Sequence, residues 1–112
     1  MNPVFKKLMT HTFTIIKRER NWEGSFEDTE TYEDIKGFAE YGKRLVTDRQ
    51  GEEVVANALI FLPNTAPIDT EYPYWVITQS APYNRVRMEI INVYPIDDPR
   101  TGKTHHYEVN VR

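Results

Sequence analysis

The sequence predicts a mainly β protein: a small antiparallel β-barrel of five or six strands, preceded by one short N-terminal helix. Three observations support this fold class. Short segments in which apolar and polar residues alternate recur along the chain, as is typical of half-buried strands. Residues that favour turns separate these segments. No segment shows the long apolar run of a buried parallel strand.

The first predicted element is a short helix over residues 1–9. Asn2 is a favourable N-cap, and Pro3 suits the first helical position. One apolar stripe then recurs at spacings of three and four residues: Val4, Phe5, Leu8 and Met9. Because a helix of two turns is marginal alone, the stripe must dock on the chain's own barrel or on a neighbouring subunit.

Six strand segments follow the helix. Their predicted bounds are 11–18, 35–41, 54–62, 74–78, 87–94 and 104–111. Residues 54–62 alternate best, with an apolar side chain at every second position. The polar stretch 19–33 contains Asn21, Gly24 and an acidic cluster, and it predicts a long hairpin connection.

The composition indicates a single domain over residues 1–112. Of the 112 residues, 39% are apolar and 28% are charged, which is enough for one core. The chain has no cysteine, which excludes disulfides, thiolate metal sites and cysteine nucleophiles. We find no signal peptide and no stretch long enough to span a membrane, so we expect a soluble protein made in a cytoplasm, with no membrane partner. The net charge of −3 is opposite in sign to that of proteins that bind DNA phosphates.

No set of residues predicts catalysis. The three histidines are His11, His105 and His106; the last two are adjacent, so in a regular strand they would point to opposite faces and would not share a metal ion. The carboxylates cluster in expected loops, and the glycines form no phosphate-binding pattern. We therefore expect no enzyme, no catalytic residue, no metal and no cofactor. A metal-dependent hydrolase that uses these histidines is the enzymatic alternative.

Basic residues beside aromatic residues suggest a different alternative. Residues 17–20 are mostly basic and precede Trp22, and Tyr83 lies close to Arg85 and Arg87 in the sequence. Such a set could stack bases and contact phosphates, as OB-fold proteins do when they bind single strands. The neighbouring acidic cluster opposes this function, and a solvated hairpin with a packed tryptophan is the simpler interpretation.

Four sequence segments occur in an informative order: MTHTFTIIKR (9–18), IKGFAE (35–40), DRQGEEVVANALIFLP (48–63), and MEIINVYP (88–95) followed after a polar turn by HHYEVNV (105–111). Together they resemble the small head-closure, or stopper, proteins of tailed phages and prophages. The resemblance covers nearly the whole chain and is one of order and register. At residues 81–84 the sequence departs from the family, which makes a tighter turn there.

The resemblance implies a non-enzymatic, twelvefold homo-oligomeric ring at the head–tail interface of a virion, assembled in the host cytoplasm. Its partners would be the portal or adaptor protein above and the tail-completion protein below. Double-stranded DNA would pass through the channel without sequence-specific binding. Phe5, Leu8 and Trp22 are the candidate contacts with other subunits or partners. A tail-completion or tail-terminator protein is the neighbouring alternative.

In the family, a loop between strands projects into the channel, closes it after DNA packaging and moves aside for ejection. By position, that projecting loop is the segment 43–53, which carries mixed charge and has a glycine near each end. In a ring, opposite charges on neighbouring loops could form ion pairs. Each pair contributes little stability, but the same pair is repeated around the ring and the contributions add. An ordinary solvated hairpin tip is the alternative. The candidate residues are Lys43, Arg44, Asp48, Arg49, Gln50, Gly51, Glu52 and Glu53.

Overall fold

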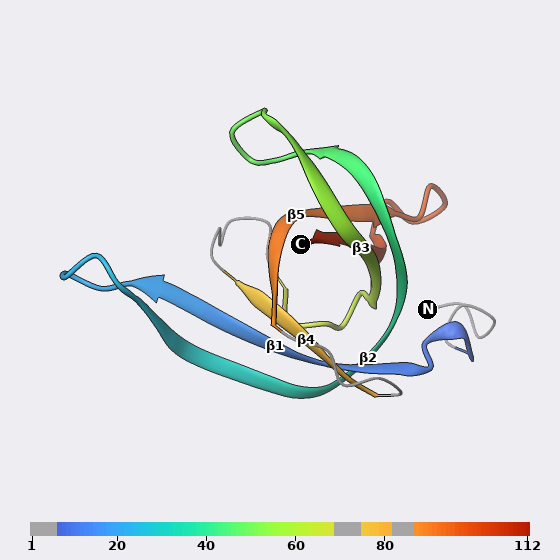
Figure 1. Ribbon diagram of the computed structural model, residues 1–112. Helices are drawn as coiled ribbons and strands as arrows, with labels where there is room; N and C mark the ends of the chain where they lie inside the picture. The colour runs from blue at the N-terminus through green and yellow to red at the C-terminus, as the bar shows by residue number, and fades with distance from the viewer. Residues whose placement is uncertain (1–6, 69–74, 82–86) are drawn as a thin grey trace.

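The computed structural model describes residues 7–68, 75–81 and 87–112 and contains six β-strands. The strands are β1 (His11–Arg20), β2 (Phe26–Thr47), β3 (Glu53–Pro63), β4 (Val76–Ala81), β5 (Met88–Asp97) and β6 (Thr104–Val111). Every pair of neighbouring strands is antiparallel, and the sheet closes into a ring in the order β1-β2-β3-β6-β5-β4 (Figure 1). The predicted mainly antiparallel β class is confirmed.

The N-terminal helix is not supported, because no helix is found among the described residues. Most of the predicted helix, including Phe5, lies outside the described residues. Only Lys7 and Leu8 have a helical backbone. The amide of Thr10 donates a hydrogen bond to the Leu8 carbonyl at 2.9 Å, and β1 begins directly afterwards.

The long strand β2 organises the sheet. Its 22 residues pair with β1 up to Gly37 and with β3 from Phe38 onward, so one continuous strand belongs to two hairpins. The prediction of a long connection over residues 19–33 is therefore wrong, since β2 begins at Phe26. The strand is polar on both faces here because this part of the hairpin pairs only with β1, and hydropathy alone cannot distinguish such a ribbon from a loop.

The core lies inside the closed sheet. Its largest fully buried apolar side chains come from four of the six strands and from the residue before β4: Phe13, Ile15, Ile60, Leu62, Trp75, Ile77, Val109 and Val111. At Gly37 the strands approach so closely that a Cβ atom would lie 2.6 Å from the Phe61 carbonyl oxygen. Glycine is required at this position by space rather than by backbone conformation.

Candidate functional site

Two hairpin arms extend from the closed sheet (Figure 1). We call residues 17–31 the first arm, where β1 and β2 pair only with each other, and residues 44–56 the second arm, formed by β2 and β3. Each arm is a two-stranded ribbon that contributes little to the core. Both arms therefore present exposed backbone edges and several exposed side chains.

The two tips are built on the same plan. In the first arm, the Asn21 side-chain oxygen accepts hydrogen bonds from the amides of Glu23 and Ser25, both at 3.0 Å. In the second arm, the Asp48 carboxylate accepts hydrogen bonds in the same way from the amides of Gln50 and Glu52, both at 2.9 Å. A glycine with positive φ lies three residues after each of these side chains, at positions 24 and 51. Each tip is thus a defined turn rather than a flexible loop.

A third turn, between β5 and β6, uses the same type of contact. The amide of Arg100 donates to the Asp98 carboxylate at 2.9 Å, and this hydrogen bond lowers the pKa of Asp98, with a smaller contribution from the Arg100 guanidinium. Asp98 is therefore ionised at neutral pH and can continue to accept the hydrogen bond that shapes the turn.

The arms carry exposed apolar side chains. Trp22, at the tip of the first arm, is 91% exposed. On the second arm, Leu45 and Val55 lie directly opposite each other in the register and are 69% and 48% exposed. Single exposed apolar residues are common on protein surfaces, but a tryptophan left almost wholly in water at a defined turn is typical of a contact surface.

The predicted loop 43–53 is only partly a loop. Residues 43–47 belong to β2 and Glu53 begins β3, so the connection is limited to Asp48–Glu52. The charged strand residues were mistaken for loop because the second arm, like the first, is a ribbon with little apolar burial. The segment still extends from the closed sheet as the end of a hairpin (Figure 1).

The second arm is tied to β5 by a buried amide. The Asn92 side-chain nitrogen donates to the Thr47 carbonyl at 2.8 Å, and the Asn92 oxygen accepts from the Asn110 side-chain nitrogen, also at 2.8 Å. Asn92 and Asn110 are both buried. A buried polar group is costly to leave without a hydrogen bond. Asn92 and Asn110 therefore hold Thr47, the residue directly before the turn of the second arm, against the closed sheet.

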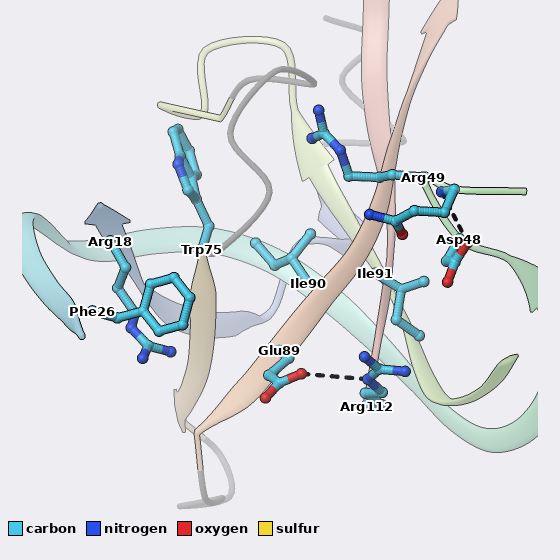
Figure 2. A pocket seen from close by; sticks show the side chains of 10 residues that line it. Arg18, Phe26, Asp48, Arg49, Trp75, Glu89, Ile90, Ile91 and Arg112 are labelled. Atoms are coloured by element: carbon cyan, nitrogen blue, oxygen red, sulfur yellow. Dashed lines mark hydrogen bonds and ion pairs between the residues drawn. The ribbon is translucent and has the colours of Figure 1, made fainter. Parts of the chain in front are cut away.

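A cavity of about 320 Å³ lies between the first arm and the tip of the second arm (Figure 2). Its apolar part consists of Trp75, Phe26, Ile90 and Ile91, and of these only Phe26 is substantially exposed. Charged and polar residues complete the lining: Arg18, Asp48, Arg49, Gln50, Glu89 and Arg112. Three of the predicted loop residues, Asp48, Arg49 and Gln50, thus form one side of a pocket, an arrangement that needs the fold and could not be predicted from spacing.

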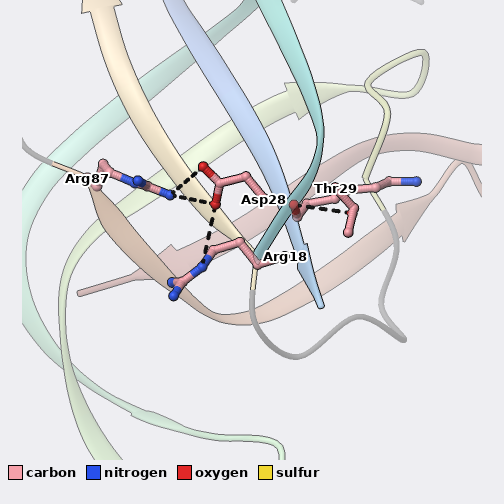
Figure 3. A network of polar contacts seen from close by, with 5 residues as sticks. Arg18, Asp28, Thr29 and Arg87 are labelled. Carbon is pink, nitrogen blue, oxygen red and sulfur yellow. Dashed lines mark hydrogen bonds and ion pairs between the residues drawn. The ribbon is translucent and has the colours of Figure 1, made fainter. Parts of the chain in front are cut away.

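The arginines of this region are positioned by carboxylates. Arg112 Nε lies 3.4 Å from Glu89 on the pocket lining. Beside the pocket, Asp28 lies between two guanidinium groups, 3.8 Å from Arg18 Nε and 3.1 Å from Arg87 Nη2 (Figure 3). All these groups are partly exposed, so each pair is worth at most about 1 kcal/mol. Their main effect is to fix where the positive charge lies.

The proposed platform for single-stranded nucleic acid is weakened by these contacts. Arg18 and Arg87 share the Asp28 carboxylate, which offsets part of their charge. Arg18 also lies over the Phe26 ring, with its guanidinium carbon 5.1 Å from the ring centroid, and thereby covers an aromatic face that a base could use. Tyr83 and Arg85 lie outside the described residues.

The histidines differ from the expectation in one respect. Although they are adjacent in β6, His105 and His106 turn toward each other, with their Nδ1 atoms 2.9 Å apart, and His106 Nε2 lies 3.2 Å from Glu108. His11 is elsewhere, stacked on Phe38. Within the described ranges, no group of three or more His, Cys, Asp or Glu side chains is arranged to hold a metal ion.

Comparisons with known proteins give no assignment: no protein-family model, curated protein or solved structure matches the chain. Of the part of the chain that the structure describes, no helix has the length and apolar character to cross a membrane.

Proposed function

We propose that the chain is a structural subunit of a phage head–tail connector and acts in the head-closure position as a homo-oligomeric ring. The pair of arms is the observation that carries this proposal. A monomer leaves the apolar side chains at their ends in water, whereas a ring gives each arm a neighbour to contact. The order of sequence segments shared with head-closure proteins supports the same role.

In this proposal the closed sheet is the small barrel of the ring subunit, and the second arm is the part that enters the channel. The hydrogen bonds of Asp48 keep the tip of the arm a defined hairpin turn. The hydrogen bond from Asn92 to the Thr47 carbonyl, beside that tip, has to break before the arm moves away from β5. Residues 43–53 carry three basic and three acidic side chains, so a ring of these segments would not retain DNA phosphates at each step of ejection.

The partners follow from this position. The portal or adaptor ring lies on the head side, the tail-completion protein lies on the tail side, and double-stranded DNA passes between them. The ring is assembled in the host cytoplasm and remains in the virion.

The test is the composition of isolated necks. Virions produced by a phage or prophage that carries this gene are disrupted, and the connector complexes are purified and analysed by peptide mass spectrometry. We expect the chain in multiple copies beside the portal. Necks that lack the chain would contradict the proposal.

The tail-completion alternative is separated by co-purification. The tagged chain is mixed separately with the portal–adaptor complex and with tail-tube proteins. Head closure predicts capture of the portal–adaptor complex. Capture of tail-tube proteins alone would place the chain on the tail side.

A further inference from the structure

We propose that the first arm of one copy docks on a second copy of the chain and seats Trp22 in the pocket between that copy's arms. This contact supplies the head-to-tail interface of the ring, so the inference rests on the proposed function and specifies how neighbouring subunits recognise each other.

The donor side is rigid and exposed. Trp22 follows Asn21, whose side chain fixes the turn through two amides, so the indole is presented from a defined backbone. It is 91% exposed. Preorganised aromatic side chains of this kind dominate binding energies, because they bury a large area at a small cost in conformational entropy.

The acceptor side has the size and chemistry for one aromatic side chain. The cavity of about 320 Å³ is at the lower limit for ligand pockets. Its floor contains Trp75, Ile90 and Ile91, which are 1%, 7% and 5% exposed. Arginine side chains at its edge can lie over an indole face, an arrangement that favours tryptophan over an aliphatic residue (Figure 2).

The two sides do not meet within one copy. Arg18 is part of the pocket lining, β1 continues from there only to Arg20, and Trp22 lies in the turn beyond it, outside the pocket lining. The high exposure of Trp22 agrees with this separation. Because donor and acceptor are different surfaces of the same chain, their contact is heterologous, and such contacts generate rings when the rotation closes.

The charge distribution favours a second copy as the occupant. Residues 19–30 contain five acidic side chains and one basic side chain, so this end of the first arm accounts for more than the chain's net charge of −3. The rest of the chain has a slight positive excess, and the pocket lining includes three arginines with two carboxylates. Docking places Glu23, which follows Trp22 in the sequence, against the arginines of the pocket lining, Arg18, Arg49 and Arg112. Such complementarity orients partners and disfavours contact between two first arms.

Site-directed cross-linking tests this contact directly, because the chain has no cysteine of its own. One variant carries Glu23→Cys beside the donor tryptophan, and a second carries Gln50→Cys in the pocket lining. The two purified variants are mixed at high concentration with a short bismaleimide, alone and in the presence of portal complexes. We expect a cross-linked dimer that contains one copy of each variant. Lys103→Cys, in the exposed β5–β6 turn, replaces Gln50→Cys in the control mixture and should give no specific product.

A second measurement tests the role of the indole. Trp22→Ala should weaken self-association about 30-fold, the change expected for a hot-spot residue worth about 2 kcal/mol. Tyr94→Ala, which removes an exposed aromatic side chain outside both arms and outside the pocket lining, should leave self-association within about threefold. If no cross-link forms between positions 23 and 50, or if the two alanine variants weaken association equally, the inference is wrong. Rings that persist without this cross-link would leave the proposed function standing, and only its interface would have to be found elsewhere.

Discussion

Replacing Asn92 with leucine removes the amide that ties the second arm to β5. The substitution keeps the branch at Cγ, although leucine is the larger side chain. It leaves the Asn110 side-chain nitrogen, which belongs to a buried residue, and the Thr47 carbonyl, which belongs to an exposed residue, without this partner. A buried neutral group without a hydrogen bond costs about 1–3 kcal/mol. Because water can replace the partner of the Thr47 carbonyl, one buried group carries the cost. We therefore expect Asn92→Leu to lower the free energy of unfolding by about 1–3 kcal/mol, a sizeable fraction of the 5–15 kcal/mol usual for a domain.

The partner substitution separates the hydrogen bonds from general effects on packing. Asn110→Leu leaves the Asn92 oxygen without its donor, but it also removes the Asn110 oxygen, which is buried and has no hydrogen-bond partner among the described residues. It should therefore cost less, about 0–2 kcal/mol. In the double variant only the Thr47 carbonyl loses a partner. The free energies of unfolding lost in the two single variants should therefore sum to more than the free energy lost in the double variant. The difference, which is the coupling energy of the two side chains, should be about 1–2 kcal/mol.

The assay is urea unfolding of the monomer at low concentration, followed by fluorescence of the buried Trp75 and by far-UV circular dichroism. Hydrogen exchange adds a local readout: in Asn92→Leu, protection should fall first in the second arm, before it falls in β1 or β6. An Asn92→Leu variant as stable as the parent, or two single losses that add fully in the double variant, would refute the role assigned to this amide pair.

Three further predictions test other parts of the fold. Gly37→Ala places a Cβ atom 2.6 Å from the Phe61 carbonyl oxygen, so it should cost about 2–3 kcal/mol and lower Tm by roughly 10 °C; a Tm within about 2 °C of the parent would contradict the close approach. The His11 Nδ1 atom accepts a hydrogen bond from the Ala39 amide at 3.0 Å, and burial lowers the pKa of His11 below 6.5. The free energy of unfolding should therefore decrease as the pH falls through and below 6.5, because the unfolded chain binds the proton more readily. His11→Gln should remove this pH dependence. Asp48→Ala removes the acceptor of two amides and should destabilise by about 1–2 kcal/mol, with exchange protection lost at the tip of the second arm and retained at that of the first.

Alternation and turn chemistry were sufficient to predict the fold class and most strand positions. The predicted segment 54–62 lies within β3, and 104–111 coincides with β6, because these strands bury one face or both and their apolar residues follow the pleat. The first half of β2 could not be found in this way. It pairs with β1 outside the core and is stabilised by cross-strand contacts such as Lys17 with Glu30, which lie 3.7 Å apart. One signal was present, although it is not specific. Asn21 and Asp48 are each followed three residues later by glycine at a tip, but Asp34 is followed in the same way by Gly37 within β2.

The candidate site was predicted only in part. Trp22 was predicted as a candidate contact residue, and this stays a prediction. The simpler interpretation of a packed tryptophan is wrong, because the side chain is 91% exposed. The pocket depends on residues 18, 49, 75, 90 and 112, which come together only when the sheet closes. Likewise, the meeting of the His105 and His106 rings depends on local side-chain rotation, which strand periodicity does not describe.

The most direct test of a ring is electron microscopy of the chain mixed with portal complexes, with class averages viewed along the symmetry axis. A head-closure subunit predicts a closed, rotationally symmetric layer on the tail side of the portal, twelvefold according to the resemblance, and Trp22→Ala should reduce its occupancy. A chain that remains monomeric with and without the portal at high concentration would contradict the account.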